Sequence, residues 1–573
     1  MKKMVGVKFS VLPAILLALA PAPGEEATSK PIVIPPVGYD VSAPLADIFA
    51  SAPAEAPAGR RVIPLRHPPQ PAPGPLSTTA EDLALQQTSL PLVSAKLALN
   101  FDGISADGGA PPDTNGSAGA TQFVQIVNTE YAVYDKTTGA LIVGPTAIHN
   151  IWSGFSGDCA DGDGGDPVVL YDKADGRWVV GQINANDNAY CLAVSTTSDA
   201  THTYYRYEFR TPNGNLPDYP KLGVWSDAYY WTANIFSGNK FLGAMRCAFD
   251  RAKMLGGGAA NAICFQQDPR VANLLPSDLD GSTQPPGAEP NLYLTFVAPS
   301  TLNIYKFHAD FINPSNSTFT GPTAVPVNPF AEACEGGICI PQAGTGQKLD
   351  SLGDRLMYRN AYRNLSGTEY LVVNHSVNVG SGKSSYTGVR WYQIANPNGT
   401  SVVAQQGTFA PDSSYRWMGS TAMDKAGDIA VGYSVSSGTI HPAIRYTGRV
   451  PTDPANMLEA EATIFEGNGS QTGGLKRWGD YSSMSIDPVD DCTFWYTTEY
   501  IPSNGKFNWH TRIASFKSRL SVRPACASLP AAALISWQPS RELASLARLV
   551  SGKSLPSFAL PMRAHLRLAA RFE

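Results

Sequence analysis

Residues 477–500 read RWGDYSSMSIDPVDDCTFWYTTEY. Serine alternates with an apolar residue over 483–486, which predicts a half-buried strand. Segment 487–491 has the chemistry of a turn, because Pro fixes φ and Asp bonds its own backbone. Aromatic and β-branched residues then predict a returning strand over 493–500. The stretch is therefore a predicted β-hairpin.

A polar cluster, residues 477–481, precedes this hairpin, and the whole unit recurs along the chain. Similar clusters, each followed by a turn and an apolar strand, begin at Gly165, Asp218, Asp354 and Arg416. The copies are on the order of 50–65 residues apart, and each has room for about four strands, which is typical of a propeller blade. The expected fold is therefore all-β, a β-propeller of about seven four-stranded blades.

The composition agrees with this fold class. The chain has 573 residues, of which 10% are aromatic and 16% charged, with 52 Gly and 46 Pro. Many aromatics, many turn formers and few charges are typical of all-β proteins. A net charge of -5 gives no indication of a nucleic-acid partner. The sequence also lacks a zinc-binding His-Glu-x-x-His motif, a Gly-x-Ser-x-Gly elbow and a phosphate loop.

Composition divides the chain into four parts. Residues 1–24 have a basic start, a short apolar run and small residues, which predicts a signal peptide that is removed from a secreted bacterial protein without a transmembrane span. Residues 25–95 are rich in Pro and Ala and predict a disordered spacer. The propeller is expected over 96–526. Residues 527–573 predict a short, basic helical tail, either accessory or surface-binding.

The eight cysteines suit an exported protein. Because each blade is a local unit, neighbour pairing is the simplest choice, although spacing alone does not determine connectivity. The expected pairs are Cys159 with Cys191, Cys247 with Cys264, Cys334 with Cys339, and Cys492 with Cys526.

Five short motifs carry a resemblance: PPDTNG at 111–116, GDP at 165–167, DYPK at 218–221, LDSLGDR at 349–355 and RWGDY at 477–481. Together they resemble a group of large secreted bacterial proteins that look like propellers. That resemblance implies an exported repeat domain, often attached to other modules. Acidic turns after short strands give a looser likeness to sialidase-like, carbohydrate-active propellers, although the turns depart from the sialidase Asp-box.

The polar clusters precede the first strand of each blade, and first strands line the axis of a propeller, so we expect the clusters to meet in one axial funnel. Carboxylates and arginines brought together shift each other's pKa and could supply a general acid and base. The alternative is structural, with Asp capping turns and Arg–Asp pairs joining blades. The predicted ligand-binding residues are Asp113, Asp166, Asp218, Tyr219, Lys221, Asp354, Arg355, Arg416, Trp417, Arg477, Asp480 and Tyr481.

A Gly-rich acidic loop precedes one of these clusters. It contains Asp158, Asp161, Asp163 and Asp166. Carboxylate oxygens on a flexible loop are suitable ligands for Ca²⁺, although the loop does not match an EF-hand. The alternative is a solvated turn that binds no metal ion.

These observations predict a secreted, monomeric β-propeller that binds an extracellular polysaccharide or cell-surface glycan in its axial funnel. Two alternatives remain open: a glycoside hydrolase or polysaccharide lyase that uses Asp, Tyr and Arg residues of the same funnel, or a non-catalytic surface scaffold or adhesion protein. The fold alone does not separate them, because propellers host all three.

Overall fold

The computed structural model describes residues 30–51, 60–64, 66–69, 82–91, 96–266, 268–517 and 526. The predicted signal peptide and the whole of the predicted basic tail, including its helical pattern, lie outside these residues. The chain divides into the units Met1–Ala527 and Ser528–Glu573, and every described residue belongs to the first.

Within the described residues, strand pairing yields seven runs of four antiparallel strands. The first run contains β7 (Asn115–Ala118), β8 (Gln122–Ile126), β9 (Glu130–Asp135) and β10 (Leu141–Ala147). The second contains β11 (Asp163–Asp172), β12 (Arg177–Asn184), β13 (Ala189–Ser195) and β14 (Tyr204–Arg210). The third contains β15 (Leu216–Val224), β16 (Ala228–Ser237), β17 (Lys240–Asp250) and β18 (Ala262–Gln266).

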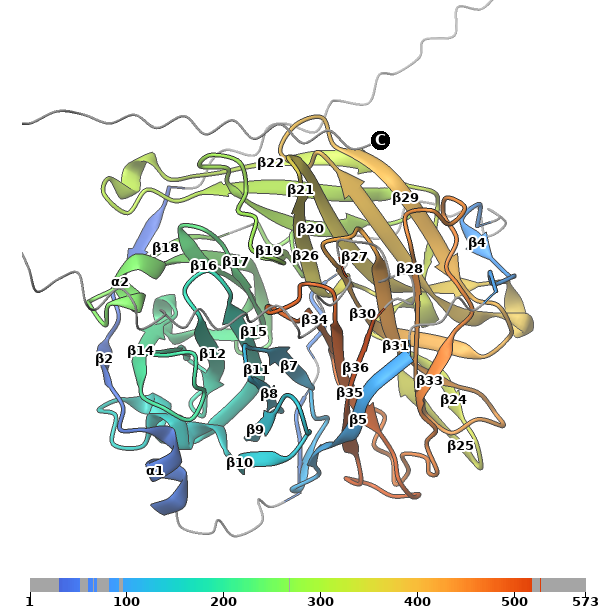
Figure 1. Cartoon of the computed structure of the whole chain (residues 1–573), viewed down its shortest axis with the longest axis horizontal. Helices are drawn as coiled ribbons and strands as arrows, with labels where there is room; N and C mark the ends of the chain where they lie inside the picture. Colours follow the sequence, from blue (N-terminus) through green and yellow to red (C-terminus); the bar gives the residue numbers. More distant parts are fainter. Residues whose placement is uncertain are drawn as a thin grey trace, which may run out of the picture. The chain divides into compact units, whose positions relative to one another are not determined.

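The remaining runs continue in chain order (Figure 1). The fourth contains β19 (Leu275–Leu279), β20 (Asn291–Val297), β21 (Thr301–His308) and β22 (Thr318–Pro326). The fifth contains β26 (Met357–Leu365), β27 (Thr368–Val379), β28 (Tyr386–Ala395) and β29 (Val402–Phe409). The sixth contains β30 (Tyr415–Met423), β31 (Ile429–Ser436), β32 (Ala443–Arg449) and β33 (Ala462–Phe465). The seventh contains β34 (Ser483–Ile486), β35 (Phe494–Tyr500), β36 (His510–Lys517) and β5 (Lys96–Ser105).

The first strand of each run lies at the axis. These inner strands contact one another in a closed cycle, from β7 through β11, β15, β19, β26, β30 and β34 back to β7. The ring closes where β5, from the start of the domain, pairs with β36 from its end, and Figure 1 shows them side by side. The predicted all-β propeller is therefore confirmed.

Packing between neighbouring sheets forms the core. Tyr446 of the sixth run stacks on Phe516 of the seventh, with ring centroids 4.1 Å apart. The inner strands differ from the expected half-buried pattern, because all four residues of β34 are buried. One face of β34 meets the next sheet, while its serines face neighbouring inner strands, where Ser483 Oγ donates to the Gly116 carbonyl at 2.9 Å. The axis is therefore a packed polar interior.

Residues expected to form a disordered spacer instead lie on the propeller. β1 (Ile32–Ile34) extends the third sheet, β2 (Gly38–Val41) the second, and β4 (Leu85–Gln86) the fifth. The structure differs from the expectation because exposed sheet edges offer backbone partners that do not require an apolar core segment. The described residues 60–64 and 66–69, named here the N-terminal strap, contain β3 (Arg61–Val62), which pairs in parallel with β6 (Gly109–Ala110).

Few other elements accompany the sheets. They include α1 (Leu45–Ser51), α2 (Arg251–Leu255), β23 (Ala331–Glu332), β24 (Ile338–Gln342) and β25 (Thr345–Asp350). In the described part of the chain, no helix has the length and apolar character needed to cross a bilayer. All four neighbour cysteine pairs are disulfides in the structure: Cys159–Cys191, Cys247–Cys264, Cys334–Cys339 and Cys492–Cys526.

Candidate functional site

Backbone bulges mark the entrances of several inner strands. A register shift interrupts the pairing of β11 with β12 between Gly165 and Val168. A second interrupts β15 with β16 between Asp218 and Lys221. At the first of these bulges the backbone is left-handed, with φ of 51° at Asp166. Such a conformation costs on the order of 1–3 kcal/mol outside glycine and is concentrated at functional sites. The bulges bring polar side chains together at one end of the axis, named here the mouth.

The mouth carboxylates join neighbouring units through backbone amides. Asp113 Oδ1 accepts the Asp480 N–H at 2.7 Å, which joins the entrance of the first four-stranded run to that of the seventh. Asp166 Oδ2 accepts the Tyr219 N–H at 2.9 Å and joins the second run to the third. Glu499 of β35 accepts the Gly479 N–H. These hydrogen bonds correspond to the structural alternative expected from the sequence, in which aspartates cap turns and charged residues join blades.

Burial shifts the protonation of these carboxyl groups. Burial, reinforced by the neighbouring Asp480 charge, raises the pKa of Asp113 well above its ordinary value. Burial also raises the pKa of Asp166, although Lys221 opposes the shift. The pKa of Asp218 rises to about 7, because burial and the Asp166 charge outweigh the nearby arginines. The mouth therefore holds carboxyl groups that retain protons nearer to neutrality than solvated aspartates do.

Lys221 lies in the centre of this cluster without a carboxylate partner among the described residues. Its side chain is fully buried. The ammonium donates to the Pro220 carbonyl at 2.9 Å and lies 3.3 Å from the ring centroid of Tyr219 and 4.1 Å from that of Tyr481. Burial lowers the pKa of Lys221 to about 7, against the opposing effect of Asp166 and Asp480. The faces of the two aromatic rings thus replace part of the electrostatic stabilisation that water would give the ammonium.

Two arginines border the cluster. Arg355 forms a two-point ion pair with Asp354, at 2.7 and 2.9 Å, and stacks 4.6 Å from the Tyr219 ring. Burial alone would raise the pKa of Asp354, but Arg355 and the strap's His67 hold it well below its ordinary value. Arg477 donates to Asp480 at 2.7 Å. Ten of the twelve predicted ligand-binding residues therefore meet at the mouth.

The other two predicted residues lie apart from this network. Arg416 forms ion pairs with Asp412 at 3.0 Å and Glu461 at 2.9 Å, beside its own sheet. Trp417 is completely buried and packs on Trp478, with centroids 5.6 Å apart. Arg416 and Trp417 follow the repeat pattern in sequence, but their side chains take up structural contacts.

The acidic loop does not gather its carboxylates around one point. Asp158 pairs with Arg210 at 2.6 Å, Asp163 with His149 at 3.0 Å, and Asp161 is exposed. In the described residues, the one group of three ligand atoms mutually within 4.8 Å is Asp424, Cys492 and Cys526, and those two cysteines form a disulfide. Calcium binding by Asp158, Asp161, Asp163 and Asp166 stays a prediction.

An open pocket adjoins the mouth. It has a volume of about 360 Å³ and is lined by Val62, His67, Ile338, Asp350, Gly474, Leu475, Lys476, Arg477 and Lys506. Burial raises the pKa of Asp350, the one acidic residue in this lining. We call this the mouth pocket; Arg477 belongs both to its wall and to the buried cluster.

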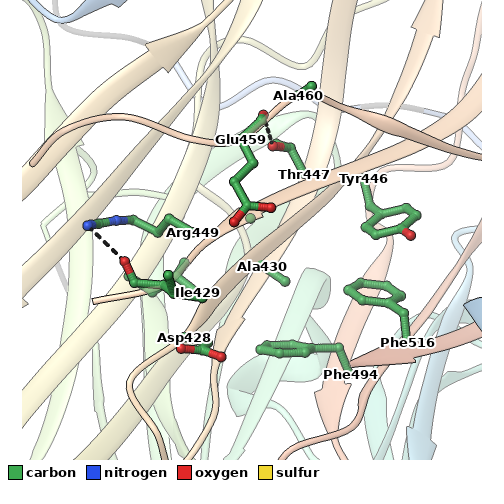
Figure 2. A pocket seen from close by; sticks show the side chains of 12 residues that line it. Asp428, Ile429, Ala430, Tyr446, Thr447, Arg449, Glu459, Ala460, Phe494 and Phe516 are labelled. Atoms are coloured by element: carbon green, nitrogen blue, oxygen red, sulfur yellow. Dashed lines mark hydrogen bonds between the residues drawn. The ribbon is translucent and has the colours of Figure 1, made fainter. Parts of the chain in front are cut away.

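A second cavity lies away from the axis, between the sixth and seventh sheets. Figure 2 shows the rings of Tyr446, Phe494 and Phe516 on one side and the charged side chains of Asp428 and Glu459 on the other. Its volume is about 30 Å³. No residue predicted from the sequence as a ligand contact lines it.

Sequence reasoning missed several residues of the mouth. Glu499 is the one acidic residue of the aromatic strand predicted over 493–500, and a charge at such a place is rarely buried without a partner. Lys476 and Lys506 carry no repeat signal. The strap residues Arg66 and His67 were assigned to a spacer, because nothing in their composition indicates what they contact.

Comparisons with known proteins show no relative in sequence: no family model and no curated protein matches. Among solved structures, the chain is similar to an α-L-arabinofuranosidase from Lactobacillus brevis (11% identity, TM-score 0.28, covering 61% of this chain and 89% of that one). It is also similar to an endo-arabinase from Bacteroides thetaiotaomicron (13%, TM-score 0.25, 51% and 95%) and to the WD40 domain of SCAP from fission yeast (9%, TM-score 0.29, 70% and 83%). TM-scores of this size establish no functional relationship.

Proposed function

We propose that this protein binds an acidic extracellular glycan in the mouth pocket. The observation that carries the proposal is the charge of the pocket lining. Lys476, Arg477 and Lys506 face one acidic residue, Asp350, whose pKa is raised. A pocket with this excess of positive charge favours carboxylate- or sulfate-bearing ligands.

The two lysines are available to a ligand. Lys476 and Lys506 are exposed, and neither forms an ion pair with another described residue. Arg477 is mostly buried, and its Nε has no hydrogen-bond partner among the described residues. Because Nη2 donates to Asp480 and Nη1 to the Ile63 carbonyl, the Arg477 guanidinium is held in one orientation and contributes a fixed positive charge to the pocket wall. The arrangement thus combines two adaptable charges with one oriented charge.

The size and setting of the pocket favour a saccharide. Its volume of about 360 Å³ lies within the range typical of ligand sites. The four disulfides agree with the expectation of an extracellular protein, whose surroundings contain uronate- and sulfate-bearing polysaccharides. Because the pocket is open, a polymer could continue past it. The predicted monomeric state and export belong to this proposal.

The experiment is a glycan array of uronate-bearing, sulfated and neutral oligosaccharides, with a melting curve for every protein used. Wild type should retain acidic glycans. Lys476→Ala with Lys506→Ala should weaken retention at least roughly tenfold, because a charge-assisted hydrogen bond contributes about 1.5–3 kcal/mol. The matched control is Lys240→Ala with Lys425→Ala, which removes two exposed lysines outside the pocket. Retention of neutral glycans alone, or of none, contradicts the proposal.

A second candidate function is cleavage of such a glycan by hydrolysis or elimination. The observation that favours it is the protonation of the mouth: the pKa of Asp218 is raised to about 7 and that of Lys221 lowered to about 7. Groups with pKa values near neutrality suit general acid–base catalysis. New reducing ends would identify a hydrolase and unsaturated uronates a lyase, and either product should be lost in Asp218→Asn.

A further inference from the structure

The N-terminal strap has an unusual composition for a segment that lies on a protein surface. Residues 60–69 read RRVIPLRHPP, with three arginines, one histidine, three prolines and no acid. Prolines favour extended backbone. An extended, basic segment of this kind is shaped like a peptide ligand and can bind an acidic groove through backbone and side-chain contacts.

The strap backbone adds to the strand that leads into the mouth. The Arg61 N–H donates to the Gly108 carbonyl at 3.0 Å, and the Ile63 N–H donates to the Ala110 carbonyl at 2.8 Å. This is strand addition to a free edge, a recurring way in which proteins bind peptides. Residue 110 lies only three positions before Asp113 of the mouth cluster.

The strap side chains then contact the predicted site residues themselves. Arg66 Nη1 lies 3.6 Å from Asp218 Oδ1, and His67 Nδ1 lies 3.0 Å from Asp354 Oδ2. In the opposite direction, Arg477 Nη1 donates to the Ile63 carbonyl at 2.8 Å. Pro68 is buried, and Val62 and His67 form part of the wall of the mouth pocket.

These contacts are specific rather than a result of chain continuity. His67 and Asp354 are 287 residues apart in sequence, and Arg477 is 414 residues from Ile63. One further carboxylate faces the strap: Asp187 lies close enough to interact electrostatically with Arg66 and Arg61. The strap is basic as a whole, and its Arg66 and His67 each meet a carboxylate of the mouth.

We propose that the mouth is a docking groove for an extended basic peptide, and that the strap fills it within the same chain. The groove recognises backbone at β6 and two basic-residue side chains, an arginine at Asp218 and a histidine at Asp354. While the strap is docked, it keeps one arm of the Arg477 guanidinium engaged. The docking groove does not depend on the proposed glycan function, since its partner is a peptide.

The test uses the full chain with residues 60–69 replaced by ten Gly and Ser residues, and a fluorescent peptide with the sequence of residues 60–69. Fluorescence anisotropy should show saturable binding with Kd below about 1 mM, because a tethered segment experiences an effective concentration in the millimolar range. The unmodified chain should bind the peptide at least tenfold more weakly, because its groove is already filled.

Specificity is tested by changing the peptide, so that a folding defect cannot explain a loss. A peptide with Arg66→Ala and His67→Ala should bind at least tenfold more weakly. A peptide with Arg60→Ala should bind as the parent does, because Arg60 is exposed and no described contact involves its side chain. No binding at 1 mM to the folded replaced chain, or equal losses for both peptides, overturns the proposal.

If the chain with residues 60–69 replaced does not fold, hydrogen exchange in the full chain tests the same proposal. In Arg66→Ala with His67→Ala, the amides of Arg61 and Ile63 should exchange at least tenfold faster while those of β7 and β34 keep their rates. Equal acceleration of all these amides would show that the strap is an integral part of the fold, and would overturn the proposal.

Discussion

The two ends of the propeller axis both contain buried charges, but they use them differently. At the end where the inner strands finish, named here the floor, Arg359 pairs with Asp278 and with Asp280, each at 2.7 Å. Lys173 adds a third pair to Asp280 at 2.9 Å. Burial would raise the pKa of Asp280, but Arg359 and Lys173 hold it below its ordinary value. Opposite charges at the floor are thus in direct contact.

The mouth also contains matched pairs, Arg355 with Asp354 and Arg477 with Asp480, but it holds in addition a buried cation without such a partner among the described residues. Lys221 contacts a carbonyl and two rings rather than a carboxylate, and its pKa is lowered to about 7 by burial. Burial likewise raises the pKa of Asp113. A floor made of matched pairs favours a structural role, whereas perturbed groups next to an open pocket favour a functional one. The comparison separates charged groups that hold the ring of sheets together from charged groups that remain available to a ligand or a reaction.

The largest expected effect is at the floor. Arg359→Ala should lower the free energy of unfolding by about 3–5 kcal/mol, because it leaves two buried carboxylates without their guanidinium. Denaturant unfolding measures the change. Arg270→Ala is the matched control: its pair with Asp268 is exposed, and it should cost less than about 1 kcal/mol. Similar losses for both variants would contradict the structural role of the floor.

The next effect is a pH dependence at the mouth. An amine whose pKa is lower in the folded than in the unfolded chain releases its proton on folding, so stability rises with pH between about 7 and the unfolded value of 10.5. Lys221→Met should remove roughly 2–4 kcal/mol of that rise. Unfolding free energies at several pH values in this window measure it, with Lys240→Met as control. Parallel curves for wild type and Lys221→Met would show that Lys221 has an ordinary pKa.

Arg416 offers an intermediate case. Although it occupies the repeat position of the mouth arginines, its partners Asp412 and Glu461 are partly exposed. We expect Arg416→Ala to cost about 1.5–3 kcal/mol of stability, the contribution of charge-assisted bonds, and to leave acidic-glycan binding unchanged. A melting curve and a binding assay on the same sample check both. A large loss of binding with normal melting would place Arg416 in the site.

The smallest expected effect concerns calcium. A ligand that binds the folded chain raises its melting temperature by mass action. Because Asp158 and Asp163 already pair with Arg210 and His149, we expect the predicted calcium site to raise the melting temperature only slightly, and a chelator to remove that rise; no change with either would contradict it. A rise with calcium that is absent from Asp161→Ala with Asp163→Ala would establish the predicted metal site.

The sequence predicted the propeller because strand alternation and a recurrent polar entrance are local signals, readable wherever they repeat. The recurrences did not reveal the run that begins with β19, because its entrance, VANL at 271–274, contains no charged residue. Asp113 and Asp480 were predicted to converge because equivalent positions meet at an axis. The strap could not be predicted, since its partners lie hundreds of residues away and its composition resembles that of a linker. Long-range ion pairs leave no local pattern.

The most direct test of the division between mouth and floor is isothermal titration of one acidic oligosaccharide into three proteins: wild type, Lys476→Ala with Lys506→Ala, and Lys173→Ala. The account predicts that the mouth variant loses at least roughly tenfold in affinity with unchanged melting, as expected for lost charge-assisted bonds. Lys173→Ala should melt earlier and bind as wild type does, since it removes a floor ion pair. Absence of binding by wild type, or equal loss of affinity in both variants, would contradict it.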